Sequence, residues 1–400
     1  MKFAHMADCH IGSWRDPKLL DLSTRAFENA VDVCVEKNVD FILISGDLFN
    51  NALPGISQLR NVVIKLKELL DNNIPVYVVQ GSHDFSPTGK TMLDVLESAD
   101  LVRNVVKGEV KNKKLHLKFS KDSSGAKVTG MPGKKGGLEK TYYEDLDREH
   151  LETESGFKIF MFHTALTELK SEELAQMDSS PISLLPKGFD YYAGGHVHEI
   201  IERDIEGYGK VVYPGPLFPN NFREIERLNH GGFYLYEDEK VEYVPLKLFD
   251  VKNISINCDD LSSEQAGAKA YDYVNDVQDK IVTLRFFGKL SSGKASEIGL
   301  GEITNKFYEN GAYFVMKNTS ALTTKDFEEI KVKDDSIENI EKQIIDEHAG
   351  SFMGKDEEIK LIRSLMSSFS QEFNDGERRT DYDERIREYA KKILEEFKVI

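Results

Sequence analysis

Short apolar runs that alternate with helical patterns constrain the first half of this chain more than any other feature. Residues 41–45 (FILIS) form a continuous apolar run closed by Gly46-Asp47, which is typical of a strand buried on both faces. Apolar residues at helical spacing in 25–36 and 56–70 separate this run from similar runs at 2–7 and 75–79. This alternation predicts an α/β domain of layered sheets flanked by helices.

Further strands are expected at 158–162, 191–193, 210–213, 232–236 and 240–246, so we place the end of the first domain at residue 248. Residues 249–325 predict a small α+β capping domain, with strands at 253–257, 281–287 and 312–317 and helices at 265–277 and 302–309. Residues 326–400 predict a charged linker followed by amphipathic helices.

The overall charge argues at first against nucleic acid as a partner. The chain has 52 Lys and Arg against 69 Asp and Glu, a formal net charge of −17. Residues 101–140 are the exception, because eleven basic and three acidic residues give them a net charge of +8. DNA therefore remains a candidate partner, with modest and salt-sensitive affinity.

Other features bear on the compartment in which the protein works. No run approaches 18 continuous apolar residues, no signal peptide is visible, and the three cysteines are scattered. These features predict reduced thiols and no membrane partner, and a cytoplasmic protein that is nucleoid-associated if the source is prokaryotic.

The residues that follow the predicted strands include a series of aspartates and histidines. Because the carboxyl ends of strands in an α/β sheet converge on one edge, we expect these side chains to meet there. They are Asp8, His10, Asp47, His83, Asp84, His163, His196 and His198.

Such a set favours metal binding. Mixed imidazole and carboxylate ligands suit Mn²⁺, Zn²⁺ or Fe²⁺. Six or more ligands exceed the needs of one ion but fit two ions about 4 Å apart, an arrangement that serves phosphoester hydrolysis. A single Asp-x-His or a lone histidine would be an ordinary turn or core residue, and only the ordered series favours a metal site.

The same series resembles the calcineurin-like metallophosphoesterase superfamily. Within it, the segments 2–12 (KFAHMADCHIG), 41–49 (FILISGDLF), 191–198 (YYAGGHVH) and 212–216 (VYPGP) are similar to the Mre-eleven (SbcD-type) DNA repair nucleases. The resemblance implies a Mn²⁺-dependent exonuclease and endonuclease with two Mn²⁺ per chain, other divalent transition metals being alternatives.

The resemblance also implies roles for the individual residues. Asp8, His10 and His198 would hold the first ion, His163 and His196 the second, and Asp47 would bridge them. His83, oriented by Asp84, would stabilise or protonate the leaving group.

Ser82 departs from the family pattern, which has asparagine as a ligand of the second metal at this position. A serine hydroxyl is shorter and a poorer neutral donor, so either the second site is weakened or a neighbour compensates. Asn50 is a milder departure, because relatives often carry His or Asp there near the substrate.

Candidate DNA contacts are basic residues near the metal motifs and in the basic region. A solvated hairpin face is the alternative interpretation of that region. The candidates are Arg15, Lys90, Lys113, Lys114, Lys134, Lys135 and Arg223.

The sequence of the C-terminal helices allows two interpretations. They either complete the fold of the second domain or dock onto a Rad-fifty/SbcC-type SMC-like ATPase, the partner that the resemblance implies for this segment. We favour docking through 358–373, with 383–397 as a second helix. The apolar stripe expected to make this contact is Ile362, Leu365, Met366, Phe369 and Phe373.

The resemblance further implies a homodimer formed through helices at 56–70 and 91–96, and DNA ends as the substrate. Two rival functions stay open on the sequence. The same metal motifs would serve a metallophosphoesterase acting on a small phosphoester or nucleotide, and Ser82 is compatible with a weakly active DNA-end-binding scaffold.

Overall fold

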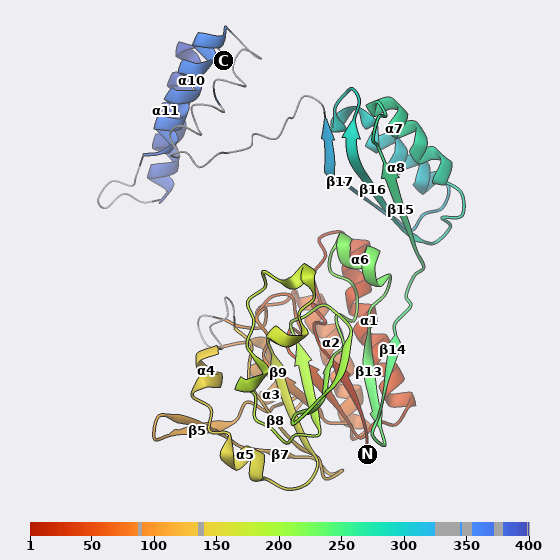
Figure 1. Ribbon diagram of the computed structural model, residues 1–400, viewed down its shortest axis with the longest axis vertical. Helices are drawn as coiled ribbons and strands as arrows, with labels where there is room; N and C mark the ends of the chain where they lie inside the picture. Colours follow the sequence, from red (N-terminus) through yellow and green to blue (C-terminus); the bar gives the residue numbers. More distant parts are fainter. Residues whose placement is uncertain are drawn as a thin grey trace. The chain divides into compact units, whose positions relative to one another are not determined.

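The computed structural model describes residues 1–86, 90–134, 140–324, 345, 354–371, 379–397 and 399 (Figure 1). The chain divides into two compact units, Met1–Thr324 and Lys325–Ile400, and each is described by itself. Among the described residues, no helix has the length and apolar character needed to cross a membrane.

Two six-stranded sheets form the centre of the first unit. In spatial order the first sheet consists of β14 (Lys240–Pro245), β13 (Gly232–Glu237), β1 (Lys2–Met6), β2 (Phe41–Ser45), β3 (Val76–Val79) and β4 (Arg103–Asn104). The second consists of β11 (Ile201–Ile205), β12 (Gly209–Tyr213), β10 (Tyr191–Gly195), β9 (Lys158–His163), β8 (Lys127–Gly130) and β7 (Ser120–Lys121). Strands β1 to β4 are parallel, as are β8, β9, β10 and β12.

The two sheets pack face to face through a buried aromatic and aliphatic layer. The Phe3 ring on β1 stacks on Phe41 of β2 and meets the edge of Tyr191 on β10, with 5.0 Å between ring centroids in each pair. His5 Nδ1 is hydrogen-bonded to the Tyr191 hydroxyl of the second sheet (3.0 Å), and its Nε2 to the Ser45 hydroxyl on β2 (2.9 Å). Burial lowers the pKa of His5 to about 3, so this ring stays neutral.

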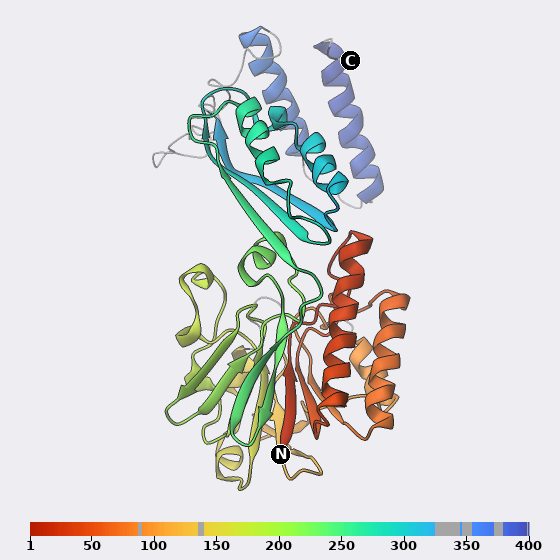
Figure 2. The same cartoon turned by 90° about the vertical axis from the view of Figure 1, so that its right-hand side faces the viewer.

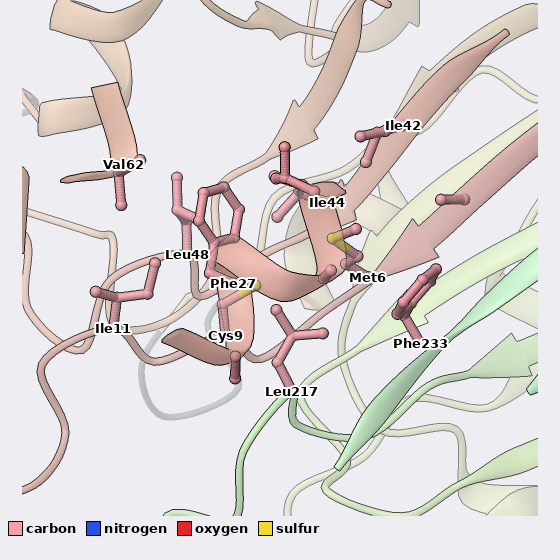
Figure 3. Close-up of a cluster of buried hydrophobic side chains, with 14 of the residues drawn as sticks. Met6, Cys9, Ile11, Phe27, Ile42, Ile44, Leu48, Val62, Leu217 and Phe233 are labelled. Carbon is pink, nitrogen blue, oxygen red and sulfur yellow. The ribbon is translucent and has the colours of Figure 1, made fainter. Parts of the chain in front are cut away.

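Helices cover the outer face of the first sheet (Figure 2). They are α1 (Pro17–Glu36), α2 (Ile56–Asp71) and α3 (Met92–Ser98). Phe27 of α1 and Val62 of α2 reach the same buried cluster as Met6 and Ile44 (Figure 3). Helix α1 begins eight residues before the predicted start, because the Asp16 side chain caps it and Pro17 occupies its first turn.

Short elements cover the outer face of the second sheet. They are α4 (Lys140–Glu144), α5 (Glu149–Thr153) and the 3₁₀ turns η2 (Thr167–Leu169), η3 (Glu172–Leu174) and η4 (Ile182–Leu184). A hairpin of β5 (Gly108–Lys111) and β6 (Lys114–Leu117) forms a separate two-stranded ribbon, and α6 (Phe222–Leu228) lies between β12 and β13 in the chain.

The segment predicted as a capping domain forms a parallel sheet with its own core. Its elements are β15 (Val251–Asn257), α7 (Ser263–Ala270), η5 (Tyr271–Tyr273), β16 (Ile281–Leu290), η6 (Ala295–Ile298), α8 (Leu300–Glu309) and β17 (Phe314–Thr324). The helix predicted at 265–277 is wrong at its C-terminal end, because Asp276 has a positive φ of 56°, which a right-handed helix excludes.

This sheet belongs to the same compact unit as the first domain. Arg285 on β16 pairs with Glu226 on α6 through two guanidinium nitrogens. The second unit contains helices α10 (Lys355–Phe369) and α11 (Arg379–Glu396), which pack against each other. The predicted fold class, a layered α/β sandwich with a small α+β cap and C-terminal helices, is confirmed, whereas the three-domain boundaries stay a prediction.

Candidate metal centre

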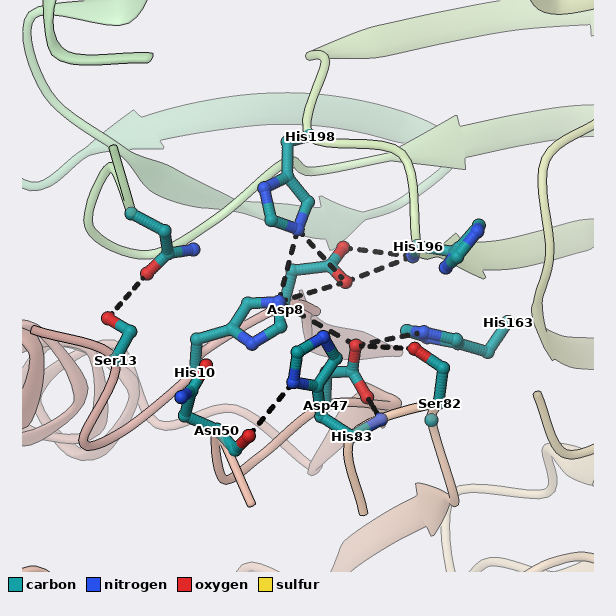
Figure 4. Close-up of polar contacts among 12 residues, drawn as sticks. Asp8, His10, Ser13, Asp47, Asn50, Ser82, His83, His163, His196 and His198 are labelled. Atoms are coloured by element: carbon teal, nitrogen blue, oxygen red, sulfur yellow. Dashed lines mark hydrogen bonds and ion pairs between the residues drawn. The ribbon is translucent and has the colours of Figure 1, made fainter. Parts of the chain in front are cut away.

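The strand ends of both sheets deliver the predicted ligands to one place (Figure 4). Asp8 and His10 follow β1, Asp47 follows β2, Ser82 and His83 follow β3, His163 ends β9, and His196 and His198 follow β10. Backbone hydrogen bonds continue the β1–β2 pairing past the strand ends, from Asp8 N to the Gly46 carbonyl (3.1 Å) and from His10 N to the Asp47 carbonyl (2.9 Å). The sheets themselves therefore fix the spacing of these side chains.

The first group of donors joins Asp8, His10 and His198. One candidate ligand atom from each residue lies within 4.8 Å of the others. The Nε2 atoms of His10 and His198 are 3.1 Å apart, and both are within 4.0 Å of Asp8 Oδ1. The Asp8 carboxylate also accepts two 3.0 Å hydrogen bonds from the His196 backbone N–H. These are the three residues expected to hold the first ion.

The second group is centred on the Asp47 carboxylate. His163 Nε2 lies 3.2 Å from Asp47 Oδ2, and the Ser82 hydroxyl donates to the same oxygen at 3.4 Å. Asp8, Asp47 and His163 offer atoms within 4.8 Å of one another, as do His10, Asp47 and His83. Among the described residues, His196 belongs to no such close group, although its ring lies 5.2 Å from that of His163.

Backbone conformation at the centre is unusual. Asp8, His10, Asp47 and His196 all have positive φ angles, of 50°, 42°, 54° and 86°. Non-glycine residues adopt this region at an energetic cost, and such residues are common at functional sites. Gly81 is needed for lack of space, because a Cβ there would lie 2.1 Å from Asp47 Oδ1.

The electrostatics of the centre favour added positive charge. Burial raises the pKa of Asp8 to about 6, and the nearby Asp47 charge adds to this. Burial alone would lower the pKa of His163, but the adjacent Asp47 raises it to about 10. Burial would likewise raise the pKa of Asp47, yet His163 and His10 hold it well below its ordinary value. Two buried carboxylates side by side need a cationic partner.

This donor set fits divalent transition-metal ions. Imidazole nitrogens and carboxylate oxygens converge from Asp8, His10, Asp47, His163 and His198. The Nδ1 atom of His163 donates to the Ser45 carbonyl at 2.8 Å, so Nε2, which faces Asp47, is the nitrogen that would exchange its proton for a metal ion. A carbonyl that fixes the tautomer in this way is typical of metal-ligating histidines.

The prediction that Asp84 orients His83 is wrong. Among the described residues, the Asp84 carboxylate accepts hydrogen bonds from the backbone N–H groups of Leu48 (3.3 Å), Phe49 (3.2 Å) and Gly81 (3.1 Å). His83 Nδ1 instead donates to the Asn50 carbonyl at 2.8 Å. Asp84 therefore joins the loops after β2 and β3, and Asn50 orients the imidazole through its backbone.

Glu224 is a site residue that the sequence analysis missed. Its Oε1 atom lies 2.9 Å from His198 Nδ1, and its other carboxylate oxygen accepts from the Asn220 backbone at 2.8 Å. Burial lowers the pKa of His198, but the hydrogen bond to Glu224 and the charges of Asp8, Glu224 and Asp47 together outweigh burial and raise it. Asn221 caps α6 with Glu224 in its first turn, an Asn-x-x-Glu pattern that signals a helix start.

Replacing Glu224 with glutamine is expected to weaken Mn²⁺ binding by about 10- to 100-fold, because the orienting partner of His198 loses its charge. Calorimetric titration of the purified variant with Mn²⁺ measures this loss. Glu226→Gln is the matched control, since Glu226 lies on the same helix but pairs with Arg285. An equal loss in both variants would assign the effect to helix stability.

The predicted DNA contacts are spread over the first unit, and one of them adjoins the metal centre. Arg223 lines a cleft of about 800 Å³ together with His196 and His198. Arg15, Lys90, Lys113 and Lys114 are exposed, the last two at the turn of the β5–β6 hairpin. Lys134 lies over the Tyr142 ring, 4.1 Å from its centroid, and Lys135 lies outside the described residues.

Acidic neighbours offset part of the positive charge of the basic region, residues 101–140. Lys107 pairs with Glu97 (3.1 Å), and both Lys111 (2.9 Å) and Lys118 (3.3 Å) pair with Glu109. Glu109 is already counted in the net charge of residues 101–140, whereas Glu97 lies outside them and further offsets the charge of Lys107. Lys113 and Lys114 at the hairpin turn are exposed.

The predicted docking stripe is partly exposed on α10. Met366 and Phe369 are exposed by 36% and 57%, whereas Ile362 and Leu365 are half-buried. Phe373 lies outside the described residues.

Residues 1–199 match the family model described as calcineurin-like phosphoesterase. The protein of Archaeoglobus fulgidus named DNA double-strand break repair protein Mre11 is 28% identical over 281 residues, which cover 64% of this chain and 61% of that protein. The protein of the same name from Thermoplasma acidophilum is 27% identical over 394 residues, covering 93% of this chain and 95% of that protein.

This chain thus spans less than two thirds of the first relative's length and nearly all of the second's. A solved structure of a dimetal phosphatase from Danio rerio shares 11% identity over 61% of this chain and 95% of that one, with a TM-score of 0.40. Through residues 1–199 the chain belongs to the calcineurin-like phosphoesterase family, and within that family it is similar to the Mre11 proteins.

Proposed function

We propose that this chain is a Mn²⁺-dependent DNA exonuclease and endonuclease that hydrolyses phosphodiester bonds in double-strand-break repair. The observation that carries the proposal is the convergence of Asp8, His10, Asp47, His163 and His198 at one buried centre. The names of the relatives, one of which aligns over 93% of this chain, support DNA repair as the process.

The residues of the centre divide the work. Asp8, His10 and His198 would hold one divalent ion and His163 a second, with Asp47 shared between them, as the convergence of these side chains supports. His196 would join the second ion, since its ring lies 5.2 Å from that of His163. The ions supply Lewis-acid polarisation of the phosphoryl group when bound. His83 uses Nδ1 to bond Asn50, so Nε2 is the atom that, when the ring is protonated, would give its proton to a leaving oxygen.

The cleft beside the centre suits a nucleic-acid backbone. Arg223, Arg227 and Arg285 line it with His196 and His198. Guanidinium groups bind phosphate without reading sequence, which is what an enzyme that acts on DNA ends requires. Arg227 and Arg285 already pair with Glu199 and Glu226, so Arg223 is the main proposed contact in the cleft. Lys113 and Lys114 on the hairpin are the proposed contacts farther along the strand.

Two substrates separate this proposal from its main rival. We expect the purified chain with Mn²⁺ to cleave linear DNA, and chelation to stop the cleavage. Hydrolysis of p-nitrophenyl phosphate without any cleavage of DNA, with or without the ATPase, would favour an enzyme for small phosphoesters and refute the nuclease assignment.

Ser82 supports a second candidate, a weakly active scaffold that binds DNA ends. Ser82 is 7% exposed, and its hydroxyl lies 3.4 Å from Asp47 Oδ2, where the family pattern supplies an amide oxygen. We predict that Ser82→Asn tightens binding of the second Mn²⁺ several-fold, because an amide oxygen is longer and a better neutral donor. A Mn²⁺ titration that gives the same two affinities for both proteins would show that Ser82 is no weakness.

We further propose that α10 docks onto a Rad-fifty/SbcC-type ATPase. The exposed Met366 and Phe369 on an amphipathic helix support this, as does the separation of Lys325–Ile400 from the first unit. A chain truncated after Thr324 is expected to bind Mn²⁺ as the full chain does but to lose co-purification with the ATPase. Retained binding would show that the helices do not dock.

A homodimer is the remaining proposal about assembly. Leu53, three residues before α2, and Ile56, its first residue, are exposed by 78% and 85%, and Val95 of α3 by 57%. Apolar exposure of this kind on the two helices that the family resemblance names supports an interface there.

A further inference from the structure

A second cluster of metal-ligating side chains lies apart from the centre described above. His116 on β6 has its Nδ1 atom 2.9 Å from Asp147 Oδ2, and His150 on α5 has its Nδ1 atom 3.4 Å from the same oxygen. One candidate ligand atom from each of the three residues lies within 4.8 Å of the others. None of the three residues contributes to the catalytic groups.

Backbone pairing builds this cluster. Leu115 N donates to the Asp145 carbonyl (2.8 Å), and Asp147 N donates to the Leu115 carbonyl (2.9 Å). These bonds hold the segment before α5 alongside β6, so Asp147 stands next to His116. His150 lies on the first turn of α5, three residues after Asp147, and its Nδ1 atom faces the Asp147 carboxylate.

The orientation of His150 is the feature that points to a ligand. Its Nε2 atom donates to the Leu117 carbonyl at 2.8 Å, so the neutral ring carries its lone pair on Nδ1. That Nδ1 atom is buried and makes no hydrogen bond within the part of the chain that the structure describes. A backbone carbonyl on one ring nitrogen and an unpaired lone pair on the other are what a metal-bound histidine requires.

We propose that His116, Asp147 and His150 bind one divalent transition-metal ion, independent of the catalytic ions. Two imidazole nitrogens and one carboxylate oxygen form a donor set that suits Zn²⁺, with solvent completing the coordination. The ion would join β6 to α5 and so fix the base of the hairpin that carries Lys113 and Lys114. Its role would be structural, because metal binding adds to the stability of the segments that it joins.

Cobalt tests this site without relying on activity. In the full chain carrying Asp8→Asn and Asp47→Asn, which disable the catalytic centre, we expect one Co²⁺ per chain by elemental analysis, with the visible absorption of a four-coordinate site. Zn²⁺ should displace it. Adding His150→Gln should remove both the ion and the absorption, whereas His230→Gln, at a half-buried histidine outside both clusters, should change neither.

A second variant guards against misfolding. Asp147→Asn keeps the size of the side chain and is expected to abolish Co²⁺ binding while circular dichroism in the presence of EDTA stays unchanged. Absence of Co²⁺ from the chain with the cluster intact, or persistence of Co²⁺ in both His150→Gln and Asp147→Asn, would overturn the proposal. Neither result depends on whether the chain cleaves DNA, so the proposed function stands or falls separately.

Discussion

Replacing Asp47 with asparagine is expected to lower Mn²⁺-dependent cleavage by about 10³-fold. Asp47 contacts donors from three strand ends, with His163 Nε2 at 3.2 Å, His10 Nε2 at 3.6 Å and the His83 backbone N–H at 2.7 Å. Metal ions supply several kcal/mol of transition-state stabilisation, and a loss of about 4 kcal/mol corresponds to about a thousandfold in rate. An amide at this position keeps the shape of the side chain but loses the charge that holds the cations.

Initial rates on linear DNA, measured across a range of Mn²⁺ concentrations, check this expectation. Asp122→Asn is the matched control, because Asp122 is also a buried carboxylate but accepts from the Tyr77 hydroxyl at 2.9 Å, away from the centre. Its rate should stay close to that of the parent chain. If high Mn²⁺ restored the Asp47→Asn enzyme to full speed, the carboxylate would serve affinity alone and its role in the reaction would be refuted.

Local patterns were sufficient to predict the elements that carry the ligands. The strand predicted at 41–45 is β2 with the same bounds, because a short apolar run closed by Gly-Asp leaves few alternatives. Helix α2 differs from its prediction by one residue at its end. Since the ligands directly follow such strands, their convergence could be inferred from the parallel topology, and the resemblance to the calcineurin-like family is confirmed.

Contacts between distant segments could not be predicted in this way. Glu224 contacts His198 because helix α6 lies next to the strand ends. The position of that helix cannot be inferred from the distance between the two residues in the sequence. The sequence predicts that Asp84 orients its neighbour His83. In the structure the Asp84 carboxylate instead accepts hydrogen bonds from backbone N–H groups that follow β2. The strength of the basic region also depended on a tertiary partner, because Glu97 offsets Lys107.

Removal of the His83 imidazole, the second of the large effects, is expected to slow DNA cleavage by about 10²- to 10⁴-fold, the usual contribution of a general acid. The ring lies against His10, with 4.7 Å between the two centroids, and its Nδ1 is held by the Asn50 carbonyl at 2.8 Å. The position is therefore adjacent to the metal centre and oriented by backbone. We expect His83→Gln and His83→Ala to lower kcat while Mn²⁺ affinity changes little.

A substrate with an activated leaving group separates proton donation from a structural role. Bis(p-nitrophenyl) phosphate releases a stable phenolate that needs no proton, so the His83 variants should be impaired far less on this ester than on DNA. His230→Ala serves as the control, because His230 is also half-buried but lies outside the metal-ligating clusters. An equal loss on both substrates would mean that His83 acts by supporting Asp47 and His10. A loss confined to DNA would identify the imidazole as the group that protonates the departing oxygen, and would exclude the non-catalytic scaffold that Ser82 suggests.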